Sequence, residues 1–176
     1  MDSLNPWKQT TWYVFHTLTL KYIPEQHDQY VRFFKSFEHI IPCDVCISHY
    51  RYQLSRRDLS VDTNINANSI FGWTVTIHNN VNSTIEKKIW AIDEAREYYQ
   101  NKKIDTKMVK TMVLEYVKHN FKKGPVKTNN LLDMLDSMRY IYPEDEKRKK
   151  LIEMNLKPTR DNIRNWLLIF LKIICE

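Results

Sequence analysis

The sequence predicts an all-α protein, and two observations carry this prediction. Only two glycines, Gly72 and Gly124, occur among 176 residues, whereas all-β and doubly wound folds need many tight turns. Apolar residues recur at steps of three and four along most of the chain, which is the pattern of amphipathic helices. The scarcity of glycine also excludes a P-loop and the glycine-rich dinucleotide fingerprint.

The first helix is expected to begin at Asn5, as N-cap, with Pro6 in the first helical position, and to end before Pro24. Trp12 and His16 are four residues apart and share a face beside its apolar stripe. A second, strongly amphipathic helix is expected to follow and to end before Pro42, with the apolar residues Tyr30, Phe33, Phe34, Phe37, Ile40 and Ile41.

A third helix is expected to begin after Pro42, with Cys43 in its first turn and Cys46 on its apolar side. Unpaired backbone N–H groups and the helix dipole favour a thiolate there, which indicates a redox-active pair. The same spacing is half of a zinc site. The alternative is a non-enzymatic zinc-binding interaction module with Cys43, Cys46 and His49 as ligands, for which no fourth ligand follows nearby.

A polar loop is expected over residues 60–68, and Asn68 or Ser69 then caps a fourth helix. Its buried stripe is predicted to consist of residues at intervals of four, namely Trp73, Ile77, Val81, Ile85 and Ile89. His78 and Asn82 project beside this stripe, where polar groups need hydrogen-bond partners. One alternative is that His78 is a core histidine whose hydrogen bonds are satisfied and that the asparagines lie on the surface. The other is that these residues form part of a binding site. A short fifth helix is expected over residues 92–99.

The charge changes near residue 102, which is the expected domain boundary. Residues 1–101 carry 10 Lys and Arg against 11 Asp and Glu, whereas residues 102–176 carry 17 against 10. Four further helices are expected here, after Asp105, after Gly124, over 144–155 and after Pro158. The basic surface is either solvated or a patch for nucleic acid or an acidic partner.

No membrane span and no secretory leader are expected. The longest apolar run, residues 166–171 resuming at Ile173, is too short to cross a bilayer, which needs about 17 residues or more. The third cysteine, Cys175, stands alone at the penultimate position. It is either incidental or a link to another subunit or a one-thiol relay.

Trp12 with His16, the Pro-Cys-x-x-Cys at 42–46 and the His-Asn-x-Val-Asn at 78–82 occur together in the order and spacing of a known family. In these motifs the chain resembles the Erv/ALR family of FAD-linked sulfhydryl oxidases, and it looks like the short members found in large cytoplasmic DNA viruses. The resemblance covers residues 6 to about 100. It implies a four-helix bundle with a short fifth helix that binds FAD without a glycine loop, followed here by an additional C-terminal helical domain.

The resemblance also implies roles for particular residues. Cys46 would face the flavin, and Cys43 would exchange with incoming thiols. Lys87 or Lys88 would meet phosphate, and His78, Asn79 and Asn82 would hold the adenine and ribose end. The full set of cofactor contacts that it implies is Trp12, His16, Cys46, Tyr50, His78, Asn79, Val81, Asn82, Lys87, Lys88, Trp90 and Tyr99.

The activity that the resemblance implies is thiol oxidation. Electrons would pass from a protein dithiol or a thioredoxin-like carrier through Cys43 and Cys46 to FAD, and then to molecular oxygen with production of hydrogen peroxide. A homodimer is expected. The expected location is the host cytoplasm (the virus factory) or the virion, and the alternative is the mitochondrial intermembrane space.

Overall fold

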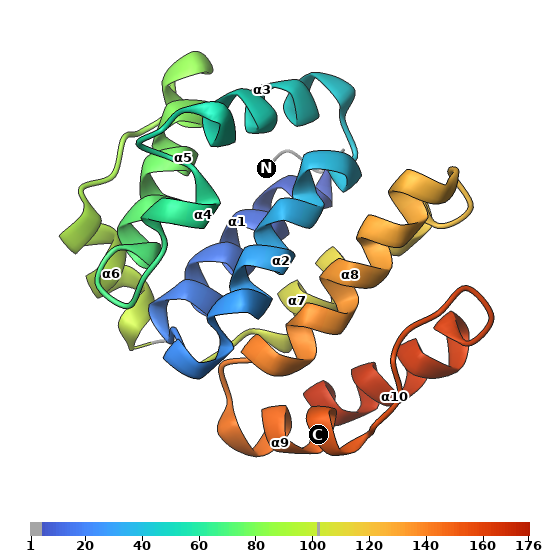
Figure 1. Cartoon of the computed structure of the whole chain (residues 1–176). Coiled ribbons are helices and arrows are strands. Elements are labelled where there is room, and N and C mark those ends of the chain that lie inside the picture. The colour runs from blue at the N-terminus through green and yellow to red at the C-terminus, as the bar shows by residue number, and fades with distance from the viewer. Residues whose placement is uncertain (1–4, 102) are drawn as a thin grey trace.

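Two antiparallel helices, α1 (Pro6–Leu20) and α2 (His27–Ile40), lie at the centre of the structure (Figure 1). This computed structural model describes residues 5–101 and 103–176. Over those residues it contains helices and no strand, so the all-α prediction is confirmed. A short 3-10 helix, η1 (Pro24–Gln26), lies between α1 and α2 along the chain. The other α-helices are α3 (Asp44–Ser55), α4 (Val61–Asn64), α5 (Ile70–Thr84), α6 (Ile92–Gln100), α7 (Thr106–Asn120), α8 (Pro125–Ile141), α9 (Asp145–Glu153) and α10 (Ile163–Cys175).

Aromatic side chains hold α1 against α2. The Phe15 ring meets those of Phe33, Phe34 and Phe37 at centroid distances of 5.9, 5.0 and 4.7 Å, each edge to face. All four side chains are buried. Edge-to-face pairs add to the stabilisation that comes from burying the ring area alone. Helices α3 to α6 pack against one side of α1 and α2 and complete the bundle (Figure 1).

Two details of the bundle differ from the sequence-based expectation. The segment 60–68, expected to be a polar loop, contains the short helix α4, and it buries Val61 and Ile65. Val61 and Ile65 are one helical step of four residues apart, but two apolar residues in a polar segment are too few to predict a helix. The predicted stripe on α5 holds for Trp73 and Ile77, but Ile85 and Ile89 are 52% and 53% exposed. The reason is that α5 ends at Thr84, so the four-residue interval no longer selects one face.

Helices α7 and α8 pack along α1 and α2 on the opposite side (Figure 1). The hydroxyl groups of Thr11 and Tyr116 lie 3.0 Å apart inside this contact, and the Asn120 side-chain amide donates to the Ile40 carbonyl at 2.8 Å. The apolar core runs through both parts of the chain. The domain boundary expected near residue 102 falls on a position outside the described residues, and it stays a prediction.

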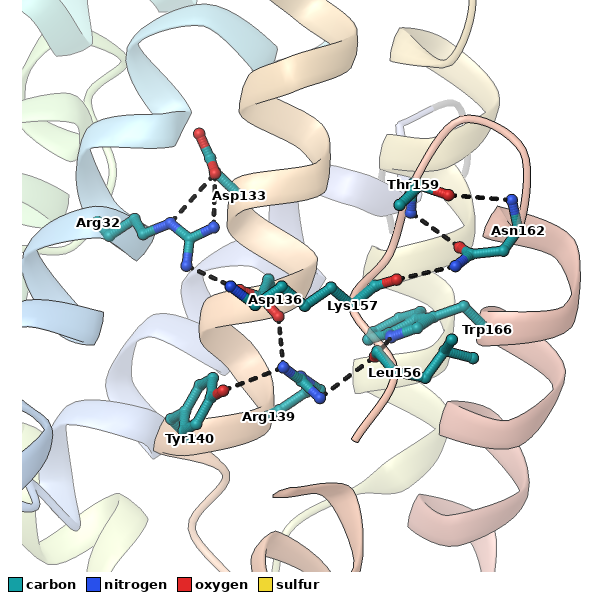
Figure 2. Close-up of polar contacts among 10 residues, drawn as sticks. All are labelled: Arg32, Asp133, Asp136, Arg139, Tyr140, Leu156, Lys157, Thr159, Asn162 and Trp166. Atoms are coloured by element: carbon teal, nitrogen blue, oxygen red, sulfur yellow. Dashed lines mark hydrogen bonds and ion pairs between the residues drawn. The ribbon is translucent and has the colours of Figure 1, made fainter. Parts of the chain in front are cut away.

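An ionic network that is buried at Asp136 and Arg139 and open to solvent at Arg32 and Asp133 joins α2, α8 and the segment that leads to α10 (Figure 2). Arg32 binds Asp133 and also donates to Asp136 at 2.8 Å. Asp136 accepts a second bond, of 2.6 Å, from Arg139, and both of these side chains are nearly inaccessible to solvent. Arg139 in turn donates to the Leu156 carbonyl at 3.2 Å. Removing one member of such a network leaves a buried charge without its partner.

Among the described residues, no helix combines the length and the apolar character that crossing a membrane would need.

Candidate active site

The Cys43 and Cys46 side chains are joined in a disulfide at the beginning of α3. Cys43 is the N-cap residue rather than a member of the first turn, and its Sγ accepts a hydrogen bond of 3.2 Å from the Cys46 backbone N–H. Both cysteines are half-buried and pack against the apolar core. The positive end of a helix dipole and an N–H donor both stabilise negative charge on sulfur. The site therefore favours Cys43 as a thiolate once the disulfide opens.

The zinc alternative finds no ligand set. Within residues 5–101 and 103–176, no group of three or more His, Cys, Asp or Glu side chains could hold a metal ion. His49, the third ligand in that reading, is exposed on α3.

A second group of predicted residues meets where α1, α5 and α6 approach one another. Trp12 and His78 stack with centroids 4.2 Å apart and 6° between their planes. His16 lies 5.2 Å from His78 and 5.1 Å from Tyr99, measured between ring centroids. The structure thus brings together four of the residues that the resemblance implied. We call Trp12, His16, His78 and Tyr99 the aromatic cluster.

A chain of hydrogen bonds favours one arrangement of hydrogens on the two imidazoles. The shortest contact of the Thr74 hydroxyl, 2.8 Å, is to the Phe71 carbonyl, whereas its contacts with Thr19 and His16 are 3.2 Å each. The buried Thr74 hydroxyl donates to the Phe71 carbonyl at 2.8 Å, so it accepts from His16 Nδ1 at 3.2 Å. The Nε2 atom of neutral His16 is then an acceptor, and it receives the Nδ1–H of His78 at 2.9 Å. These tautomers are assigned from the hydrogen-bond partners. They leave Nε2 of His78 as a hydrogen-bond acceptor.

Both imidazoles are neutral near pH 7. Burial, with a smaller contribution from His78 when that ring is charged, lowers the pKa of His16 to about 3. Burial likewise lowers the pKa of His78 to about 4, helped by the positive charge of Lys87. An apolar environment disfavours the charged form of histidine. The cluster therefore presents uncharged rings to any ligand.

The asparagines of α5 shape the segment that follows that helix. The Asn79 amide donates to the Trp90 carbonyl at 2.8 Å and accepts from the Trp90 N–H at 3.0 Å. Asn82 donates to the Lys88 carbonyl at 2.9 Å. The Lys88 ammonium lies 4.1 Å from the Trp90 ring centroid, and Lys87 is exposed beside it. Both amides thus hold the segment that carries the two lysines and Trp90.

The other predicted contacts lie elsewhere. Tyr50 is 5% exposed, and its hydroxyl donates to the Phe34 carbonyl at 3.1 Å, within the apolar core. Val81 is half-buried on α5. A role in cofactor binding stays a prediction for Tyr50 and Val81, as it does for Asn79 and Asn82.

Sequence reasoning missed Thr74, Phe71 and Arg96. Thr74 is four residues before His78, so the helical repeat could have placed it below that imidazole. Phe71 lies 5.9 Å from His16, and the Arg96 guanidinium lies 4.9 Å from the Phe71 ring centroid. No sequence pattern signals either contact, because the first depends on how α1 meets α5 and the second on how α6 meets α5.

Comparison with known proteins gives a family and three viral relatives. The family described as Erv1 / Alr matches residues 9–102. A probable FAD-linked sulfhydryl oxidase of Acanthamoeba polyphaga mimivirus is 30% identical over 95 residues, which are 52% of this chain and 66% of that protein. FAD-linked sulfhydryl oxidases of two African swine fever virus isolates, Pig/Kenya/KEN-50/1950 and Tick/Malawi/Lil 20-1/1983, are each 25% identical over 119 residues, or 65% of this chain and 92% of theirs. No solved structure is a significant match.

Proposed function

Because the chain belongs to the Erv1 / Alr family, we propose that it is an FAD-dependent thiol oxidase whose redox-active disulfide is Cys43–Cys46. The observation that carries the proposal is the position of this disulfide at the N-terminus of α3, with a backbone N–H directed at Cys43 Sγ. The names of the viral relatives support the same activity.

Three features in and beside the aromatic cluster support FAD binding there. Trp12, His78 and Tyr99 offer flat aromatic faces to ring systems. His78 Nε2 offers an acceptor for an amino or hydroxyl group. Lys87 offers positive charge to a pyrophosphate, and Lys88, which pairs with Glu94 in this structure, would add its charge on leaving that pair. No glycine loop is needed for this arrangement. FAD bound there would supply a two-electron acceptor, with molecular oxygen as the final acceptor and hydrogen peroxide as the product.

The two cysteines divide the thiol chemistry between them. A substrate thiolate attacks Cys43 Sγ, the Cys43–Cys46 bond breaks, and Cys46 leaves as a thiolate. The second substrate thiol then attacks the substrate sulfur of the mixed disulfide, and Cys43 leaves as a thiolate. The hydrogen bond from the Cys46 N–H lowers the cost of that charge and makes Cys43 a better leaving group. The substrate loses two electrons and two protons, and the chain holds a dithiol.

The direct test uses the purified full-length chain. It should show the visible absorption bands of a flavin, and it should consume oxygen and release hydrogen peroxide when it is given dithiothreitol. A colourless protein without oxygen uptake would contradict the proposal.

Two cysteine variants separate the roles. Cys46→Ser should retain flavin and lose turnover, since the aromatic cluster is built from other helices. Cys175→Ser is the matched control, because Cys175 is a free, exposed thiol at the end of α10. It should retain turnover. Loss of turnover in this control would instead support a relay through Cys175.

Substrate, location and assembly follow the same proposal. The substrate class is a protein dithiol or a thioredoxin-like carrier. Viral relatives support a viral origin and hence the host cytoplasm or the virion, and the mitochondrial intermembrane space remains the alternative. A homodimer also remains a prediction, which light scattering on the full-length protein would test.

A further inference from the structure

The turn between α7 and α8 is anchored beside the redox disulfide. Lys127, in the first turn of α8, places its Nζ 3.6 Å from a carboxylate oxygen of Asp44, the residue that follows Cys43. At the end of α7 the buried Asn120 amide donates to the Ile40 carbonyl at 2.8 Å, just before the cysteine motif. Figure 1 shows this turn and the start of α3 at the same end of the molecule. The turn is therefore attached to the region around the cysteine motif at both of its ends.

This turn is strongly basic. Residues 118–127, which we call the basic turn, contain four lysines and one histidine and no acidic residue: Lys118, His119, Lys122, Lys123 and Lys127. All except Lys127 are exposed. The nearby carboxylates are Asp44, which pairs with Lys127, and Glu115, which lies 3.8 Å from Lys118. Lys122 and Lys123 thus supply a positive surplus next to the disulfide.

Charges from the basic turn and from α3 both act on His119. Burial lowers the pKa of His119, and the positive charges of Lys127 and Lys123 lower it further, whereas Asp44 and Glu115 oppose them. His119 therefore lies within electrostatic reach of residues from both the turn and α3. Residues 102–176 carry a net charge of +7 (17 Lys and Arg against 10 Asp and Glu), and the four lysines of the basic turn supply +4 of it.

Glycine and proline set the backbone conformation of the turn. Gly124 has φ of 93°, which favours glycine, and Pro125 begins α8 directly afterwards. Two apolar residues flank the ion pair of Asp44 and Lys127, since Val45 is 65% exposed and Val126 is 56% exposed. The surface beside the cysteines thus combines positive charge with small apolar contacts, a combination that suits a protein partner.

We propose that the basic turn docks the reducing partner, a dithiol protein with an acidic surface around its cysteines, against Cys43. This inference rests on the proposed function, and it names the substrate class for that site. Complementary charge raises the rate of encounter and selects among partners. A protein is the occupant rather than a nucleic acid, because the charge adjoins a disulfide whose chemistry is exchange with thiols. The turn lies outside the residues that match the family.

The test compares two synthetic peptides that share one Cys-x-x-Cys core, one flanked by glutamates and the other by lysines. The unsubstituted protein should oxidise the acidic peptide with the higher kcat/KM, and added salt should reduce the difference. In Lys122→Glu/Lys123→Glu the ratio of acidic to basic kcat/KM should fall by about tenfold or more. The matched control is Lys107→Glu/Lys110→Glu, which makes the same charge change at exposed positions near the other end of α7. Its ratio should stay at the unsubstituted value.

A binding measurement separates failure of this inference from failure of the oxidase function. Oxidation of dithiothreitol by the unsubstituted protein reports the oxidase function alone. Fluorescence anisotropy of the two peptides with serine in place of both cysteines reports docking without turnover. Equal affinity for both peptides, or an equal effect of the two double variants, would overturn docking by the basic turn even in an active oxidase. Loss of single-stranded DNA binding in Lys122→Glu/Lys123→Glu, with an unchanged peptide ratio, would instead assign the turn to nucleic acid.

Discussion

Trp12 lies parallel to His78, with 4.2 Å between the ring centroids and 6° between the planes. The two residues come from α1 and α5, which are far apart in the sequence. This stack joins the first of the resemblance motifs to the last. The proposal of a flavin site depends on the aromatic surface that these two partly exposed rings present.

Replacing Trp12 tests that surface. Trp12→Leu should raise the dissociation constant for FAD by about tenfold, because an aromatic contact contributes roughly 0.5 to 1.5 kcal/mol beyond its buried area. Flavin fluorescence during titration of the apoprotein would measure it. Tyr52→Leu, at an aromatic that is 65% exposed on α3, is the control and should bind FAD normally. An unchanged affinity in Trp12→Leu would place the cofactor elsewhere.

The two neutral histidines make stability depend on pH. The folded-state pKa of His16, about 3, lies below its value of 6.5 in an unfolded chain, so the unfolded chain binds the proton first. The stability that depends on a neutral His16 is present in full above pH 6.5 and is lost as the pH falls toward 3. Urea unfolding between pH 6.5 and 5 should show a loss approaching ~1.4 kcal/mol per pH unit for each such histidine.

The pH prediction has a matched pair of variants. His16→Gln should reduce the slope of unfolding free energy against pH by the ~1.4 kcal/mol per pH unit that one such histidine contributes. His49→Gln, at an exposed histidine on α3, should leave the slope as it is. Equal slopes in the unsubstituted protein and in His16→Gln would show that His16 is not buried as a neutral group.

The buried ionic network should make a large contribution to stability. Asp136→Asn should lower the free energy of unfolding by on the order of 3 kcal/mol, because Arg139 would keep its buried charge without a charged partner. Asp145→Asn breaks another ion pair of the same i,i+3 spacing, with Arg148, but at an exposed aspartate. It should cost less than about 1 kcal/mol. Similar losses in both variants would mean that the burial of Asp136 does not matter.

Removing the C-terminal helices tests the domain prediction. A chain that ends at residue 101 loses the cover that α7 and α8 give to α1 and α2, including the contact between Phe37 and Tyr116, whose centroids are 5.2 Å apart. We expect this fragment to self-associate or aggregate, because large apolar faces become exposed. Size-exclusion chromatography with light scattering would measure it beside the full-length chain. A monomeric, cooperatively unfolding fragment would show that residues 1–101 fold alone.

The sequence predicted the helices well because their signals are local. Caps such as Asn5 with Pro6, and Asp105 before α7, lie next to the elements that they start. The aromatic cluster was also within reach, since the resemblance named Trp12, His16, His78 and Tyr99. Thr74 and the path of α7 along α1 were not predictable in the same way. Both depend on which helix faces meet, and one sequence does not specify that.

The hydrogen bonds from His78 to His16 to Thr74 all run in one direction, and they end on the Phe71 carbonyl, which can only accept. The Phe71 carbonyl takes the Thr74 hydroxyl hydrogen in the shortest of that group's contacts, at 2.8 Å, which leaves the Thr74 oxygen to accept from His16. With its hydrogen on Nδ1, the His78 imidazole accepts a hydrogen bond at Nε2. It therefore favours ligands that donate a hydrogen to Nε2 over ligands that offer only an acceptor. The Phe71 carbonyl, at the start of α5, thus favours hydrogen-bond donors among the ligands that could bind at His78 Nε2.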